Sequence, residues 1–218
     1  MCKISVKNCI VSLALILQMR SKKRTNIKGS SETKTVNEFP IVGIGASAGG
    51  LEPITKVLEN LPIQTGLSFV VIQHLATGQA SMLPEILSRS TKMNVQQATD
   101  GMQVEKDQVY VISPGTTLTL KNGCIKVLPK NLPSKPINDF LVSLAQEKKT
   151  RAIGIVLSGT GNDGTEGLKA IRAEGGITFA QDPDTAQYPD MPKNAMAAET
   201  PDFILSPRTN NKRASKNR

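Results

Sequence analysis

Short continuous apolar runs alternate along the chain with stretches whose apolar residues recur every three or four positions. The continuous runs are typical of strands buried on both faces of a sheet, and they occupy residues 40–46, 67–75, 151–159, 177–182 and 202–205. The periodic stretches predict helices at residues 51–61, 81–91, 137–149, 163–176 and 193–199. Strands that alternate with helices predict a three-layer α/β domain with a doubly wound, mostly parallel sheet.

Residues 108–128 interrupt this alternation of strands and helices. They hold two strand-like segments, VYVI and TLTL, and then the dipeptide Asn122-Gly123 ahead of IKVL. Asn-Gly is a strong signal for a tight hairpin turn, because both residues tolerate the positive φ angles that such a turn needs. We therefore expect an antiparallel hairpin appended to the sheet.

The net charge of +9 is concentrated at the two ends of the chain. Residues 1–38 hold eight Lys and Arg against two acidic residues, and residues 208–218 hold five against none, which leaves about −2 for residues 39–207. We interpret 1–38 as a disordered basic leader or linker, 39–207 as one folded domain and 208–218 as a basic tail. Basic ends without a basic groove argue against a specific nucleic-acid partner.

The apolar run at residues 10–17 is too short to span a bilayer, and no clear signal-peptide cleavage site follows it. Secretion is therefore the less favoured alternative to a cytoplasmic location. Cys2, Cys9 and Cys124 form no C-x-x-C pair, so neither a disulfide framework nor a zinc site is expected. We expect a cytoplasmic protein with no metal and no membrane span.

The glycine-rich turn GIGASAGG at residues 43–50 has three interpretations. Its glycine spacing fits a dinucleotide-binding turn, the segment around Ser47 fits a nucleophile elbow, and the turn could also carry no chemistry. A dinucleotide site needs an acidic residue at the end of the second strand, where this chain has His74. A P-loop needs Lys-Ser or Lys-Thr after the glycines, which this sequence lacks. These two features disfavour a nucleotide cofactor.

Three polar residues are expected to meet at the carboxyl ends of neighbouring strands. Ser47 ends the first strand, His74 is the only histidine and ends the second, and Asp163 follows the strand at 151–159. An imidazole can take the serine proton, and a carboxylate can fix the tautomer of the ring. This chain order differs from the Ser, acid, His order of α/β-hydrolases, so we expect another scaffold.

Alternatives to Asp163 as the third residue remain open at this point. The alternative for Asp163 itself is the N-cap of the following helix, which would be the favoured interpretation without Ser47 and His74. The other candidate acids lie near prolines, where turn chemistry accounts for each of them, and they are Asp182, Asp184 and Asp190.

Four motifs, IGASAGG, VVIQHL, SGTGNDG and AQDPDTAQYPDMP, resemble in order and spacing the catalytic domain of CheB-type chemotaxis protein-glutamate methylesterases. The resemblance covers residues 39–207. It implies a doubly wound catalytic domain that hydrolyses glutamate γ-methyl esters on chemoreceptors without a cofactor, and in many members deamidates receptor glutamines. It also implies the roles of nucleophile for Ser47, base for His74 and orienting acid for Asp163, with oxyanion donors at the backbone of Ala48 and Thr160.

The sequence departs from the pattern of this family at several positions. Ala48 stands where the family usually has Thr, Thr160 where it often has Met, and Asp190 where it often has Gly. The segment PGTTL at 114–118 lacks a histidine that the family often has there. The chain looks closest to methylesterase modules fused to methyltransferase and sensor-kinase segments, which makes such proteins expected partners besides the receptor. We expect no control by a preceding receiver domain, and a catalytically idle regulatory module is the alternative function.

Overall fold

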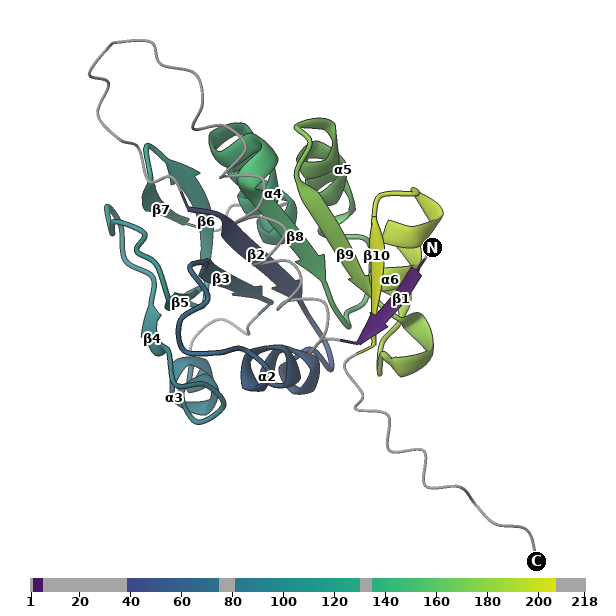
Figure 1. Cartoon of the computed structure of the whole chain (residues 1–218), viewed down its shortest axis with the longest axis horizontal. Helices are drawn as coiled ribbons and strands as arrows, with labels where there is room; N and C mark the ends of the chain where they lie inside the picture. The colour runs from purple at the N-terminus through teal and green to yellow at the C-terminus, as the bar shows by residue number, and fades with distance from the viewer. Residues whose placement is uncertain (1, 6–38, 75–80, 130–134, 207–218) are drawn as a thin grey trace, which may run out of the picture.

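A computed structural model of the chain describes residues 2–5, 39–74, 81–129 and 135–206, and the structural statements below concern these residues. Its main feature is an eight-stranded sheet in which every neighbouring pair of strands is parallel (Figure 1). From one edge to the other, the strands are β1 (Cys2–Ser5), β10 (Phe203–Ser206), β9 (Ile177–Gln181), β8 (Ala152–Val156), β2 (Ile41–Ala46), β3 (Ser68–Gln73), β5 (Gln108–Val111) and β4 (Asn94–Gln97). The strand order places the first strand of the folded domain, β2, in the middle of the sheet.

Helices cover both faces of this sheet and make the three layers that the sequence predicts. The helices are α2 (Leu51–Glu59), α3 (Leu83–Ser88), α4 (Pro136–Lys148), α5 (Thr165–Ala173) and α6 (Asp190–Ala197), with short 3₁₀ turns η1 (Lys149–Arg151) and η2 (Pro183–Thr185). Two buried clusters show the layering. One joins the sheet to α2 and α3, and the other joins it to α4, α5 and α6. The predicted α/β fold is confirmed.

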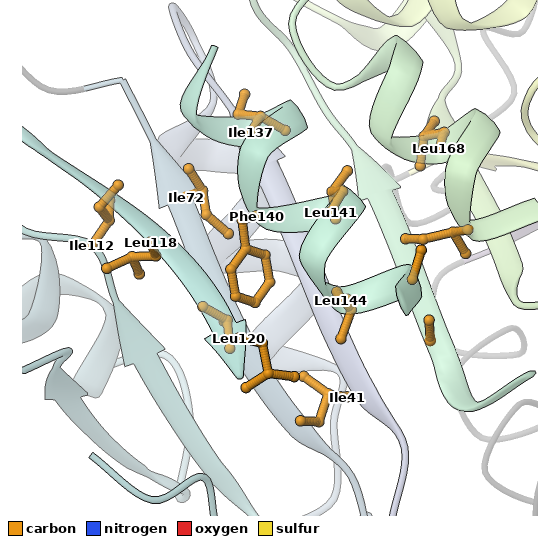
Figure 2. Close-up of a cluster of buried hydrophobic side chains, with 14 of the residues drawn as sticks. Ile41, Ile72, Ile112, Leu118, Leu120, Ile137, Phe140, Leu141, Leu144 and Leu168 are labelled. Atoms are coloured by element: carbon orange, nitrogen blue, oxygen red, sulfur yellow. The ribbon is translucent and has the colours of Figure 1, made fainter. Parts of the chain in front are cut away.

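Helix α4 is the centre of the second cluster (Figure 2). Its residues Phe140, Leu141 and Leu144 are fully buried. They face the sheet residues Ile41 and Ile72. Truncating a buried Phe to Ala typically costs about 3–5 kcal/mol. The large apolar contact of α4 therefore anchors the start of this helix, and the start of α4 reaches the candidate site.

The predicted hairpin is formed by β6 (Thr116–Lys121) and β7 (Cys124–Pro129). Its turn has positive φ at both Asn122 (52°) and Gly123 (75°), as tight hairpin turns require. The hairpin is a separate two-stranded sheet that packs on α4. Hydrogen bonds from Leu120 N to Ser143 Oγ (2.9 Å) and from Gly123 N to Glu147 Oε1 (2.9 Å) fix it there.

Strand β1 differs from the expectation for the N-terminal segment. Residues 2–5 lie inside the leader that we expected to be disordered, and they pair in parallel with β10, from Cys2 opposite Phe203 to Ser5 opposite Ser206. The outer edge of β10 offers unpaired N–H and C=O groups, and an extended segment satisfies them by adding a strand. The expectation of disorder is therefore wrong for these four residues, while residues 6–38, with the apolar run 10–17, and the tail 208–218 lie outside the described residues.

Candidate active site

The candidate site lies where the central strands β2, β3 and β8 end. The register pairs Ala46 with Gln73, and the N–H of His74 donates to the carbonyl of Ala46 (3.1 Å). Ser47 and His74 are thus the first residues beyond two hydrogen-bonded parallel strands. On the other side of β2, strand β8 ends at Val156, and its loop leads to Asp163. Ligands of open α/β folds bind at this carboxyl edge.

A hydrogen bond joins the two acid–base candidates. His74 Nε2 lies 2.8 Å from Asp163 Oδ2, and the Asp163 side chain is buried, with 6% of its surface exposed, while 31% of the His74 side chain is exposed. The imidazole therefore keeps one nitrogen toward Asp163 and leaves Nδ1 for another partner. This geometry brings together the two residues that sequence reasoning paired.

Backbone groups at the start of α4 hold the Asp163 carboxylate in place. Oδ2 accepts the N–H of Ile137 (3.1 Å), and Oδ1 accepts the N–H of Asn138 (2.9 Å). The N–H of Gly164 also donates to Oδ1 (2.9 Å). Asp163 therefore caps α4, a helix distant in sequence, while Gly164 occupies the N-cap of α5, the helix that follows it. Capping and bonding to His74 are both functions of one carboxylate.

Asn138 completes this support from the opposite direction. The side chain is buried, and its Oδ1 accepts the N–H groups of Gly164 (2.9 Å) and Gly167 (3.0 Å). The first turn of α4 and the first turn of α5 thus bind each other through Asn138 and Asp163. The neighbouring Asp139 has a carboxyl pKa raised by burial and then by the negative charge of Asp163.

The turn that carries Ser47 is held by main-chain hydrogen bonds. Ser47 N donates to Ser158 O (3.0 Å), and Gly50 N donates to Ser47 O (3.0 Å). Gly49 has a φ of 66°, a conformation that other residues rarely adopt. Among the residues that the structure describes, no hydrogen bond joins Ser47 Oγ to the His74 ring.

The two expected oxyanion donors belong to peptide units whose carbonyls are already bonded. In a trans peptide the C=O and the next N–H point in opposite directions. Ser47 O is bonded to Gly50 N, so the Ala48 N–H points away from the first turn of α2. Gly159 O accepts the N–H of Met191 (3.0 Å), so the Thr160 N–H points away from the start of α6. Within the described part of the chain, neither N–H donates to a protein acceptor.

A family model described as CheB methylesterase matches residues 42–212 of this chain, which include every residue of this site. The chain belongs to the CheB methylesterase family. It is 31% identical over 172 residues to a Leptospira interrogans protein provisionally named protein-glutamate methylesterase/protein-glutamine glutaminase, covering 77% of this chain and 89% of the relative. It is also 31% identical over 201 residues to a protein-glutamate methylesterase/protein-glutamine glutaminase of Carboxydothermus hydrogenoformans, covering 85% of this chain and 58% of the relative.

A solved structure of the same family has the same fold. The crystal structure of the Thermotoga maritima CheB methylesterase catalytic domain superimposes on this chain with a TM-score of 0.70 at 29% sequence identity. The match covers 78% of this chain and 93% of the other. The CheB resemblance expected from four short motifs is therefore confirmed over the whole folded domain.

The other acidic candidates have different surroundings in this CheB-family domain. Asp182 is buried, and its carboxylate accepts the N–H of Asp184 (3.3 Å) within the η2 turn. Asp184 is exposed in the same turn, and Asp190 is exposed in the first turn of α6. The carboxylate that the structure brings to His74 is that of Asp163.

A pocket of about 440 Å³ opens beside the Ser47 turn. It lies between α2 and the segment 181–187, with Gly49 at the end nearest the turn. Charged and polar side chains from both elements line it, including the Glu52–Lys56 ion pair. The pocket therefore adjoins the serine side of the site and takes no part of its lining from His74 or Asp163.

Sequence reasoning missed two buried residues that shape the site, Asn138 and Ser158. Neither has a short-range signal, because each acts on backbone groups far along the chain. Asn138 bonds Gly164, 26 residues away, and Ser158 bonds Ala48, 110 residues away. For Ser158 the available signal was its place as the first residue of the SGTGNDG motif.

Two further observations concern the described residues alone. No group of three His, Cys, Asp or Glu side chains among them is arranged to bind a metal ion. None of the helices in the described ranges is both long and apolar enough to cross a bilayer.

Proposed function

We propose that this CheB-family domain is a serine esterase that hydrolyses glutamate γ-methyl esters on chemoreceptors or receptor-like proteins and releases methanol. The observation that carries the proposal is the His74–Asp163 hydrogen bond at the end of β3, beside the end of β2 that bears Ser47. The names of the relatives, protein-glutamate methylesterase/protein-glutamine glutaminase, support the substrate class.

In the first half of the reaction, Ser47 Oγ attacks the ester carbonyl carbon while its proton passes to His74. Because Nε2 is bonded to the Asp163 carboxylate, Nδ1 is the ring nitrogen that accepts this proton. Asp163 holds the tautomer and stabilises the imidazolium that forms. The carbonyl oxygen becomes an oxyanion, for which the Ala48 and Thr160 N–H groups are the proposed donors.

In the second half, the tetrahedral intermediate collapses and the bond to the methoxy oxygen breaks. His74 returns its proton to that oxygen, and methanol leaves. Water then attacks the acyl-serine, gives a proton to His74 and releases the glutamate side chain as a carboxylic acid, while Ser47 regains its proton. Hydrolysis of a glutamine amide follows the same steps with ammonia as the leaving group, which accounts for a glutaminase activity on the same site.

We also propose that the enzyme acts in the cytoplasm on a methylated receptor. A methyltransferase or a sensor kinase of the same signalling pathway is its proposed further partner. Both follow from the family resemblance.

The test is methanol release from membranes that carry a methylated receptor, with wild type beside Ser47→Ala. By analogy with other serine hydrolases, loss of the nucleophile is expected to lower kcat about 10⁶-fold. Ser88→Ala is the matched control, because Ser88 is an exposed serine at the end of α3, and it should release methanol at the wild-type rate.

Equal methanol release by wild type and Ser47→Ala would overturn the esterase proposal. No release by the wild type from any methylated receptor, together with binding to receptor or methyltransferase, would favour the idle regulatory module. Saturable binding of NAD or ATP that Ser47→Ala leaves intact would instead support a nucleotide site at the glycine turn.

A further inference from the structure

Ser158 is the residue at which the parts of the proposed oxyanion hole meet. It lies two residues beyond the end of β8 and is fully buried. Its N–H donates to Gln181 Oε1 (2.9 Å), and its carbonyl accepts the N–H of Ser47 (3.0 Å). Its hydroxyl bonds two other segments. Every polar group of this residue therefore has a partner, and the partners lie at the carboxyl ends of two strands, in the turn after β2 and in the end of β9 with the segment that follows it.

The hydroxyl of Ser158 acts first on the serine turn. Its Oγ–H donates to the carbonyl of Ala48 (2.9 Å). The peptide that carries the Ala48 N–H is already fixed at Ser47, by the bonds to Ser158 O and from Gly50 N. The hydrogen bond to the Ala48 carbonyl fixes the peptide group that follows Ala48. The peptide groups before and after this residue are then both held, which determines the direction of the Ala48 N–H.

The same hydroxyl acts on the loop that supports the second donor. Ser158 Oγ accepts the N–H of Tyr188 (3.0 Å), and Tyr188 O accepts the N–H of Gly159 (2.9 Å). Gly159 O is bonded to Met191 N, which sets the direction of the Thr160 N–H. The position of the Thr160 N–H therefore depends on the loop that contains Tyr188, and the Ser158 hydroxyl holds this loop beside the end of β8.

We infer that Ser158 is a positioning residue that sets the spacing and direction of the Ala48 and Thr160 N–H groups through its buried hydroxyl. The inference rests on the proposed function and adds a residue to it. Ser158 itself touches no reacting atom. Its effect is expected mainly on the step in which the oxyanion forms, because fixed donors act on charge that develops in the transition state.

Ser158→Ala removes the hydroxyl and leaves the Ala48 carbonyl and the Tyr188 N–H without this partner. We expect kcat for methanol release to fall by about 10–100-fold, the size of effect that a displacement of about 1 Å produces. KM should stay close to the wild-type value, because the donors contribute little to ground-state binding. Ser158→Thr keeps the hydroxyl and should recover most of kcat.

Thr178→Val is the matched control for the loss of a buried hydroxyl. Thr178 is fully buried in β9, and its Oγ1 bonds Thr200 O (2.7 Å) and Asp202 Oδ2 (2.8 Å), near the opposite end of that strand from the site. We expect Thr178→Val to lower Tm as Ser158→Ala does and to leave kcat unchanged. A merely structural role for Ser158 would make the two variants behave alike.

The outcomes separate this inference from the proposed function. If Ser47→Ala abolishes release and Ser158→Ala keeps wild-type kcat, the positioning role is wrong and the esterase proposal stands. If Ser47→Ala keeps full activity, the proposed function fails first. Equal losses of kcat in Ser158→Ala and Thr178→Val would also overturn the inference. If Ser158→Ala does not fold, Ser158→Cys decides, because a thiol of similar size is a weak donor, and the inference then requires kcat in the order Ser, Thr, Cys.

Discussion

The two sides of the candidate site are built in different ways. On the acid–base side, the Asp163 side chain is bonded to His74 and to backbone N–H groups of α4 and of Gly164. On the side of the proposed nucleophile, which we call the nucleophile side, main-chain bonds fix the turn of Ser47, and the Ser158 hydroxyl joins this turn to its neighbours. On the acid–base side, the start of α4 thus holds the side chain of Asp163. On the nucleophile side, residues at the ends of strands hold backbone N–H groups.

This difference agrees with the role that we propose for each side. A base needs one ring nitrogen in a set tautomer, and a buried carboxylate bonded to three backbone N–H groups can hold that ring rigidly. An oxyanion hole needs N–H groups that point into the site, and only backbone direction can provide them. In the described residues the serine hydroxyl and the ring are not yet hydrogen-bonded, and catalytic bonds of this kind often tighten when substrate binds.

On the acid–base side, the largest loss of activity is expected from a change at Asp163. Asp163→Asn is expected to lower kcat about 10⁴-fold, as an orienting Asp→Asn change does in other serine hydrolases, because an amide favours the wrong ring tautomer. The measurement is methanol release from methylated receptor membranes. Asp182→Asn is the control, since this buried acid caps the η2 turn, and its kcat should stay near that of wild type. An equal loss in both variants would return Asp182 to candidacy.

On the nucleophile side, the most sensitive position is Gly159, which lies against Ser47 and Met191. A Cβ at this residue would clash with the Met191 sulfur and would lie 2.8 Å from Ser47 Cβ. We expect Gly159→Ala to displace the Thr160 N–H and to lower kcat about 10²–10³-fold, the cost of losing one oxyanion donor.

Gly161→Ala sharpens this second test, with the same methanol assay. Gly161 lies in the same loop with a φ of 80°, but a Cβ there would meet no atom within 4 Å. It should cost stability through backbone strain, about 1–3 kcal/mol, and change kcat much less than Gly159→Ala. If both variants lose activity equally, loop strain rather than contact with Ser47 explains the loss.

The parts of the fold that the sequence predicted depend on local pattern. Buried strands such as β2 and β3 are continuous apolar runs, and the hairpin turn has its own dipeptide, Asn122-Gly123. The contact of His74 with Asp163 was predictable because parallel strands bring their carboxyl ends to one edge. These features need no knowledge of distant contacts.

The parts that were missed depend on pairing over long distances. Strand β1 is four residues long, and its position follows only from the free edge of β10, about two hundred residues later. Asp163 does cap a helix, but the helix is α4 and not α5, which follows it in the sequence. Nothing in the local sequence shows that α4 starts beside Asp163. Ser158 looked like one more small residue in a glycine-rich loop for the same reason.

The smallest expected effect concerns charge at the acid–base side, where the start of α4 carries a second carboxyl, Asp139. A helix start favours an ionised carboxylate, but partial desolvation and then the charge of Asp163 oppose it and raise the pKa of Asp139. Asp139 is an exposed residue, so solvent screens this repulsion and the effect on stability is small. Ionising Asp139 therefore costs folding free energy. That cost is absent below the ordinary carboxyl pKa and grows as the pH rises through the raised value.

Replacing Asp139 by Asn should therefore raise Tm slightly at pH 7 and make no difference at pH 3, where the wild-type carboxyl is protonated. Thermal unfolding at both pH values measures this, with Asp184→Asn as a control that removes one negative charge from another exposed residue, in the η2 turn. A stabilisation that persists at pH 3 would come from the amide's own hydrogen bonds and not from relief of charge. A lower Tm at pH 7 would mean that the attraction of the helix start outweighs the repulsion by Asp163, and that the α4 start can hold two carboxylates at once.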